Sequence, residues 1–120
     1  MIEKLEINGV KVDVDEDIKK YIHKKIGKLD RLMPRHARKS AHAKVVLSRS
    51  KGKKQEPTCE ATIELPGKTL NAKESTINMY SSIDIVESKL ARQLRKYKTT
   101  HDSRGDKTSV REFLGRLRNR

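Results

Sequence analysis

Lysine and arginine side chains spaced one helical turn apart are the residues of this 120-residue chain best placed to do chemistry. The first set is Lys20, Lys24, Lys28 and Arg31, with Lys25 on its flank, and the second set is Lys89, Arg92 and Lys96. At 100° per residue, each set falls on the side of a helix opposite its apolar residues. One helical turn rises about 5.4 Å, which is comparable to the separation of successive phosphates along a nucleic-acid strand. Because each neutralised phosphate releases condensed counterions, the two sets predict binding to a nucleic-acid backbone.

The net charge of the chain points to the same class of partner. Lys and Arg number 29 against 16 Asp and Glu, a formal charge of +13, and residues 16–39 carry the largest share of this excess. RNA is favoured over DNA because no helix-turn-helix pattern is present, and a domain that reads RNA through shape and phosphates needs few aromatic residues. An anionic membrane is disfavoured, since neither long helix has the Trp or Phe of an interfacial anchor.

Residues that could support catalysis are sparse. The four histidines lack metal-ligand spacing, and the glycines match no phosphate-binding loop. Cys59 alternates with Ala61 and Ile63, which predicts a small buried hydrophobic residue rather than a reactive thiol. Glu60 and Glu64 lie on the other face of the same strand and are expected to be solvated. We therefore expect a protein that is not an enzyme and that uses no metal and no cofactor.

Two long helices must position the cations. Apolar residues at three- and four-residue steps predict a helix over residues 16–33, with Asp15 as its N-cap and Pro34 as its stop. A second helix is predicted over residues 78–98, with a continuous apolar stripe. On that helix Tyr97 falls on the stripe and Tyr80 at its margin. Both tyrosines are therefore expected in the core or at its edge rather than in a base-stacking site.

Period-two alternation predicts the strands. They cover residues 5–14, with a bend at Asn8-Gly9, and then residues 43–47, 59–65 and 69–72. A basic loop at residues 49–54 follows the second strand, and a tight turn at Pro66-Gly67 joins the last two. The order β-α-β-β-β-α predicts an α+β fold, with two helices packed on one face of a mostly antiparallel four-stranded sheet. Residues 1–98 would form this domain.

The remaining residues, 99–120, are expected to form a basic tail. Residues 99–109 have no apolar side chain and predict a linker. Ser109 and Glu112 then have capping-box spacing ahead of four apolar residues on one face, which predicts a short amphipathic helix that needs a surface to fold against. With one cysteine and no apolar run longer than residues 45–47, the chain is expected in the cytoplasm.

Two motifs in the predicted helices resemble a known family. The segment Asn78-Met-Tyr-Ser-Ser-Ile-Asp84, followed by Lys89-Leu-Ala-Arg-Gln-Leu-Arg-Lys-Tyr-Lys98, closely resembles the signature of the ribosome hibernation-promoting factor and ribosome-associated inhibitor (protein Y) family. Lys25-x-x-Lys28-Leu29-Asp30 is similar to that family's basic motif. The resemblance covers about residues 2–98. We expect a short member of the family, because the 22 residues after Lys98 are too few for the dimerisation domain of long members.

This resemblance implies a fold similar to the double-stranded RNA-binding domain. It also implies a site in the decoding groove of the small subunit of a bacterial ribosome, where the protein would exclude tRNA and mRNA and keep idle ribosomes intact under stress or in stationary phase. By family similarity, rRNA would be contacted by Lys25, Lys28, Lys89, Arg92 and Lys96. Additional rRNA contacts are expected from Lys20, Lys24, Arg31, Arg95 and Lys98. The free protein is expected to be a monomer.

Two other functions stay open on the sequence alone. One is a general double-stranded RNA-binding protein or ribosomal protein unconnected with stress. The other is a modulator of a sigma factor or another protein, in which the cations would face an acidic protein surface.

Overall fold

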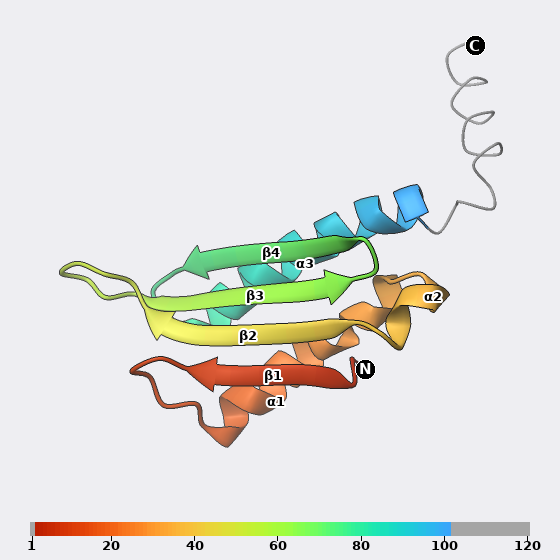
Figure 1. Ribbon diagram of the computed structural model, residues 1–120. Coiled ribbons are helices and arrows are strands. Elements are labelled where there is room, and N and C mark those ends of the chain that lie inside the picture. Colours follow the sequence, from red (N-terminus) through yellow and green to blue (C-terminus); the bar gives the residue numbers. More distant parts are fainter. Residues whose placement is uncertain (1, 102–120) are drawn as a thin grey trace, which may run out of the picture.

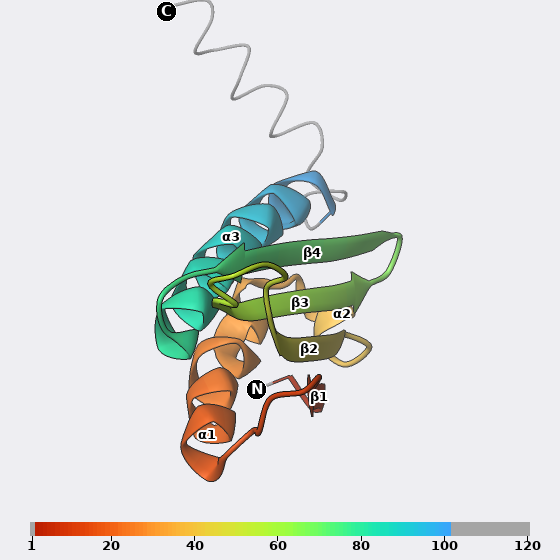
Figure 2. The same cartoon turned by 90° about the vertical axis from the view of Figure 1, so that its left-hand side faces the viewer.

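The computed structural model describes residues 2–101, which form a four-stranded sheet with the helices on one face (Figures 1 and 2). The strands are β1 (Lys4–Gly9), β2 (His42–Arg49), β3 (Pro57–Leu65) and β4 (Lys68–Ser75). The helices are α1 (Glu16–Lys25), the 3₁₀ helix η1 (Gly27–Leu32), α2 (Arg35–Arg38) and α3 (Met79–His101). The strands lie in sequence order, with β1 parallel to β2 and the other two pairs antiparallel. The predicted α+β fold is confirmed, with α2 as an additional short helix.

The core lies between the sheet and the two long helices. Alternate residues of β2 and β3 face the helices, and Val45, Leu47 and Ile63 are fully buried there. From the other side, Ile22 of α1 and Leu90 of α3 are also fully buried. Since α1, η1 and α3 all pack on this one face, their opposite sides are turned outward together (Figure 2).

Both long helices begin at the residues that the sequence predicts. The Asp15 side chain accepts a 2.8 Å hydrogen bond from Ile18 N–H at the start of α1. Asn78 does the same for Ser81 N–H at the start of α3, also at 2.8 Å. Each cap satisfies a backbone donor that has no partner within the helix.

The first helix is shorter than predicted. The expectation of one helix over residues 16–33 is wrong, because α1 ends at Lys25 and the chain tightens into η1. Glycine disfavours a helix interior, and the Gly27 carbonyl here accepts a 2.8 Å hydrogen bond from Ile2 N–H. Leu29 and Met33 nevertheless stay buried. The apolar spacing therefore predicted burial correctly but not a continuous α-helix.

The first strand also ends early, at Gly9 instead of residue 14. A Cβ on Gly9 would lie 2.2 Å from the Val12 carbonyl oxygen, so the chain folds back on itself directly after the strand. Lys11 adopts a positive φ of 57° within this return. Val12 and Val14 are half-buried against the core from the loop, which explains why they alternate without belonging to a strand.

The end of α3 lies beyond its predicted limit. The helix continues to His101, so the expectation of a linker is wrong for residues 99–101. The amphipathic helix predicted for residues 109–120 lies outside the described residues. Within residues 2–101, no helix combines the length and the apolar character needed to cross a membrane.

Candidate nucleic-acid interface

The cations of α1 and η1 gather along the seam between these helices and α3. Lys24, Lys25, Lys28 and Arg31 line a hollow of about 180 Å³, and Glu87 of α3 contributes one carboxylate to it. Lys24, Lys28 and Arg31 are exposed, as is Lys20 one turn earlier on α1. The change from α-helix to 3₁₀ helix at Gly27 therefore does not separate the cations of α1 from those of η1. Four of the predicted residues converge on one small region of the outer helical face.

The cations of α3 divide into two groups. Arg92, Arg95, Lys96 and Lys98 are exposed, as predicted. Neither Arg92 nor Lys96 forms an ion pair with another residue in the described part of the chain. The helix α3 lies beside α1 and η1 (Figure 2), so the exposed cations of all three helices lie on neighbouring parts of the protein surface.

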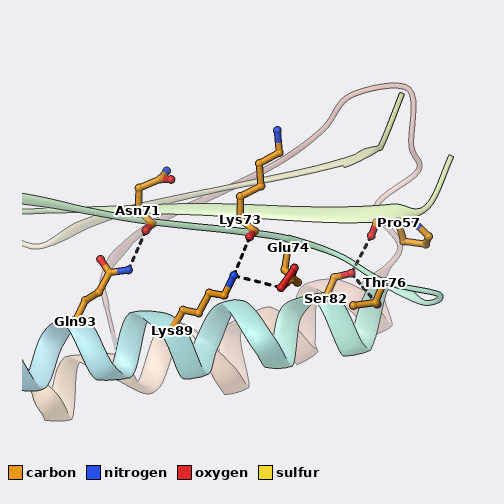
Figure 3. A network of polar contacts seen from close by, with 8 residues as sticks. All are labelled: Pro57, Asn71, Lys73, Glu74, Thr76, Ser82, Lys89 and Gln93. Carbon is orange, nitrogen blue, oxygen red and sulfur yellow. Dashed lines mark hydrogen bonds and ion pairs between the residues drawn. The ribbon is translucent and has the colours of Figure 1, made fainter. Parts of the chain in front are cut away.

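Lys89 differs from these residues because its side chain is engaged by the edge of β4. Its Nζ donates a hydrogen bond to the Lys73 carbonyl at 3.3 Å and pairs with Glu74 Oε1 at 3.2 Å (Figure 3). Gln93, one turn later, likewise donates to the Asn71 carbonyl at 2.9 Å. The expectation that Lys89 points away from the sheet with Arg92 and Lys96 is therefore wrong. The side chain reaches from the flank of α3 to the edge of β4, where it caps a strand carbonyl.

The seam between α1 and α3 also contains a group that sequence reasoning missed. Tyr21 of α1 donates a 2.5 Å hydrogen bond to Asp84 of α3, and Lys25 Nζ lies 3.7 Å from the same carboxylate oxygen. Lys25 Nζ is also 5.7 Å from the centre of the Tyr21 ring, within cation–π range. Tyr80 meets Tyr21 edge to face, with 4.9 Å between the ring centroids. Asp84 is the last residue of the motif that resembles the family signature, which was the available signal, but its partner Tyr21 lies 63 residues away in the sequence.

The Asp84 carboxylate makes the Tyr21 phenol less acidic. Its hydrogen bond, followed by partial burial and the nearby negative charges, raises the pKa of Tyr21 to about 12. The tyrosine is therefore a fixed neutral donor at physiological pH, and Lys25 is the cation of the group.

The residues considered for catalysis lie apart from this surface. Cys59 is fully buried, as predicted, and burial raises the pKa of its thiol to about 12. Glu60 accepts a hydrogen bond from Asn71 on the outer face of the sheet, and His42 lies 3.9 Å from Glu6 on the same sheet. Among residues 2–101, no three His, Cys, Asp or Glu side chains are grouped to hold a metal ion.

These features define a class of protein: a small α+β domain that carries an array of cations on the outer face of two neighbouring helices. The chain belongs to the family described as Sigma 54 modulation protein / S30EA ribosomal protein, whose sequence profile matches residues 5–102. The family predicted from the motifs of the two helices is thereby confirmed.

Two curated relatives carry the same name. The chain is 42% identical over 98 residues to the ribosome hibernation promotion factor of Lactococcus lactis subsp. cremoris, which covers 80% of this chain and 50% of the relative. It is 38% identical over 96 residues to the ribosome hibernation promotion factor of Staphylococcus aureus, covering 80% of this chain and 48% of the relative. The chain thus spans about half the length of the curated relatives that it matches.

Two solved structures have the same fold. The N-terminal domain of Thermus thermophilus protein Y superposes with a TM-score of 0.66 and 26% identity, covering 77% of this chain and 94% of that domain. A ribosomal subunit interface protein from Coxiella burnetii gives a TM-score of 0.64 and 28% identity, covering 80% of this chain and 98% of the other.

Proposed function

We propose that this protein binds the small ribosomal subunit through the outer face of α1, η1 and α3 and inhibits translation by occupying the groove that tRNA and mRNA use. The observation that carries the proposal is the convergence of Lys24, Lys25, Lys28 and Arg31 on one hollow beside α3. The names of the relatives, ribosome hibernation promotion factors and a subunit interface protein, support the choice of the ribosome as the anionic partner.

The mechanism is steric and electrostatic. Lys25, Lys28, Arg92 and Lys96 would each neutralise an rRNA phosphate, and the released counterions would supply affinity. Lys89 would contribute after leaving Glu74, because its Nζ is occupied in the free protein. Lys20, Lys24, Arg31, Arg95 and Lys98 would enlarge the contact. No bond is made or broken, so the protein would act without a metal or a cofactor, and the idle ribosome would stay assembled.

This function places the protein in the cytoplasm, on the ribosome, during stress or in stationary phase. We further propose that the free protein is a monomer. Residues 1–98 would be enough to bind rRNA, and the basic residues of 99–120 would increase the affinity.

Binding to purified small subunits at several salt concentrations tests this proposal, with tRNA as the competitor. The test variant carries Lys28→Ala, Arg92→Ala and Lys96→Ala. Its matched control carries Lys4→Ala, Lys44→Ala and Lys73→Ala, which removes the same charge from exposed positions on the outer face of the sheet. We expect the test variant to bind more weakly, with a log-log salt slope shallower by roughly 2–3, and the control to stay close to wild type.

Two results would count against the proposal. Equal losses in both triple variants would mean that only net charge matters. Binding to free duplex RNA without competition against tRNA on the small subunit would favour a general double-stranded RNA-binding protein instead.

A further inference from the structure

Tyr80 is the only one of the three tyrosines whose place neither burial nor hydrogen bonding explains. Tyr97 is 3% exposed and donates to the Pro66 carbonyl at 2.9 Å, and Tyr21 donates to Asp84. Tyr80 is 40% exposed, and its hydroxyl has no hydrogen-bond partner within residues 2–101. The sequence placed this ring at the edge of the core, and the structure instead leaves much of it open to solvent.

The ring is nevertheless held in a fixed orientation. Its contact with Tyr21 is nearly perpendicular, at 81° between the ring planes, which is a favoured geometry for an aromatic pair. Tyr21 is itself anchored by Asp84 and flanked by Lys25. A side chain that is already ordered before binding loses little conformational entropy when a ligand covers it.

The position of the ring connects it to the cationic hollow. Tyr80 contacts Tyr21, Tyr21 contacts Lys25, and Lys25 lines the hollow with Lys24 and Lys28. An exposed aromatic ring beside a row of cations is the combination that binds unpaired nucleotides, since the cations take the phosphates and the ring stacks on a base. A paired base in an A-form helix is already stacked and offers no free face to such a ring.

We propose that Tyr80 stacks on one unpaired RNA base while Lys25 and its neighbours in the hollow bind the adjoining phosphates. This inference rests on the proposed function and deepens it. It specifies that the bound rRNA segment presents a single-stranded nucleotide at the start of α3, in addition to phosphates along the helices. Tyr21 and Asp84 then act as positioning residues for the ring.

The test compares Tyr80→Leu with Tyr80→Phe in the full chain, by binding to purified small subunits. Leucine keeps apolar bulk against Tyr21 but has no aromatic face, whereas phenylalanine keeps the ring. We expect Tyr80→Leu to lower the affinity about tenfold, or ~1.4 kcal/mol, and Tyr80→Phe to stay within about twofold of wild type. The salt slope should be unchanged in both, because stacking releases no counterions, whereas loss of a phosphate contact flattens it.

A second measurement does not depend on how well the leucine variant folds. The chain contains no Trp, so Tyr80→Trp introduces a single indole fluorophore at the site. Stacking on a base should quench its fluorescence when small subunits are added. Thr69→Trp, at an exposed position on the outer face of the sheet, is the control and should remain unquenched.

The outcomes separate the two proposals. If wild-type protein does not bind small subunits, the proposed function fails, and this inference fails with it. If wild type binds while Tyr80→Leu binds equally well, or Tyr80→Trp remains as bright as the control, only the stacking site is overturned.

Discussion

The phenol of Tyr21 donates a 2.5 Å hydrogen bond to Oδ1 of Asp84, and this contact ties α1 to α3. Lys25, one turn further along α1, lies 3.7 Å from the same oxygen. One carboxylate therefore orients both a neutral ring and a cation on the outer helical face. Asp84 is thus an anionic group within a mainly positive surface, where it fixes the positions of the side chains around it.

The first prediction concerns the acidity of Tyr21. In Asp84→Asn the carboxylate is lost, and with it the main cause of the raised pKa, so the value should fall from about 12 toward the ordinary 10. An absorbance titration of tyrosinate measures this, with Tyr21→Phe identifying which transition belongs to Tyr21. Identical titrations in wild type and Asp84→Asn would show that the hydrogen bond is absent in solution.

The same contact makes stability depend on pH in the alkaline range. Because the folded-state pKa of Tyr21 lies above its unfolded value, the hydrogen bond contributes fully below pH 10 and is lost as the pH rises from about 10 to about 12. The free energy of unfolding should therefore fall more steeply over this range in wild type than in Tyr21→Phe. The Cys59 thiol also titrates there, but it is present in both proteins, so urea unfolding of the pair isolates the tyrosine.

The sequence predicted the elements of this fold better than their ends. Capping by Asp15 and the burial of Cys59, predicted from its alternation with Ala61, depend on local signals, and each is confirmed. The early end of α1 was missed, because apolar spacing continues through η1 while the backbone tightens at Gly27. The end of β1 was missed because Val12 reaches the core from a loop.

In the candidate site, too, the sequence predicted some features correctly and others incorrectly. Helical spacing correctly placed Lys24, Lys28 and Arg92 on the exposed face. It misplaced Lys89, since a long side chain on the flank of a helix points toward whichever acceptor the neighbouring strand supplies. The partners of Asp84 could not be predicted from the spacing of residues on one helix, because they come from another element.

The second prediction follows from the position of Lys89. Lys89→Ala should weaken binding to the small subunit less than Arg92→Ala does, because Lys89 Nζ must first leave Glu74 and the Lys73 carbonyl. In a Glu74→Gln background the lysine is released from its ion pair, and the effect of Lys89→Ala should grow. A double-mutant cycle of binding affinities measures this coupling.

The stability of the same variants provides the control. The Lys89 and Glu74 side chains are 43% and 31% exposed, so breaking the pair should cost no more than about 1 kcal/mol of folding free energy. Equal binding losses for Lys89→Ala and Arg92→Ala, with both proteins stably folded, would contradict the orientation of Lys89 in the free protein.

The third prediction compares Gly9, at the end of β1, with Gly67, in the turn between β3 and β4. In Gly9→Ala the new methyl would meet the Val12 carbonyl at 2.2 Å and a Val14 methyl at 2.9 Å, so the return from β1 to α1 must move. We expect a loss of about 2–3 kcal/mol in the free energy of unfolding. At Gly67, where φ is 76°, an added Cβ would have no atom within 4 Å beyond the neighbouring residues, so Gly67→Ala should cost only about 1 kcal/mol, from backbone strain alone. Chemical denaturation distinguishes the two, and a larger loss at Gly67 would mean that the β1–α1 return is not as tight as described.

The fourth prediction concerns the single cysteine. Cys59 is fully buried in β3, and its pKa is raised to about 12, so neither access nor thiolate formation favours reaction in the folded protein. A thiol reagent near neutral pH should therefore label it only as fast as the chain opens, and labelling should become complete in denaturant. Cys59→Ser would bury a hydroxyl among apolar side chains and should cost about 1–3 kcal/mol, whereas Cys59→Ala should cost less than the serine variant. Rapid labelling of the native protein, or a serine variant as stable as the alanine one, would show that β3 is open to water at this position.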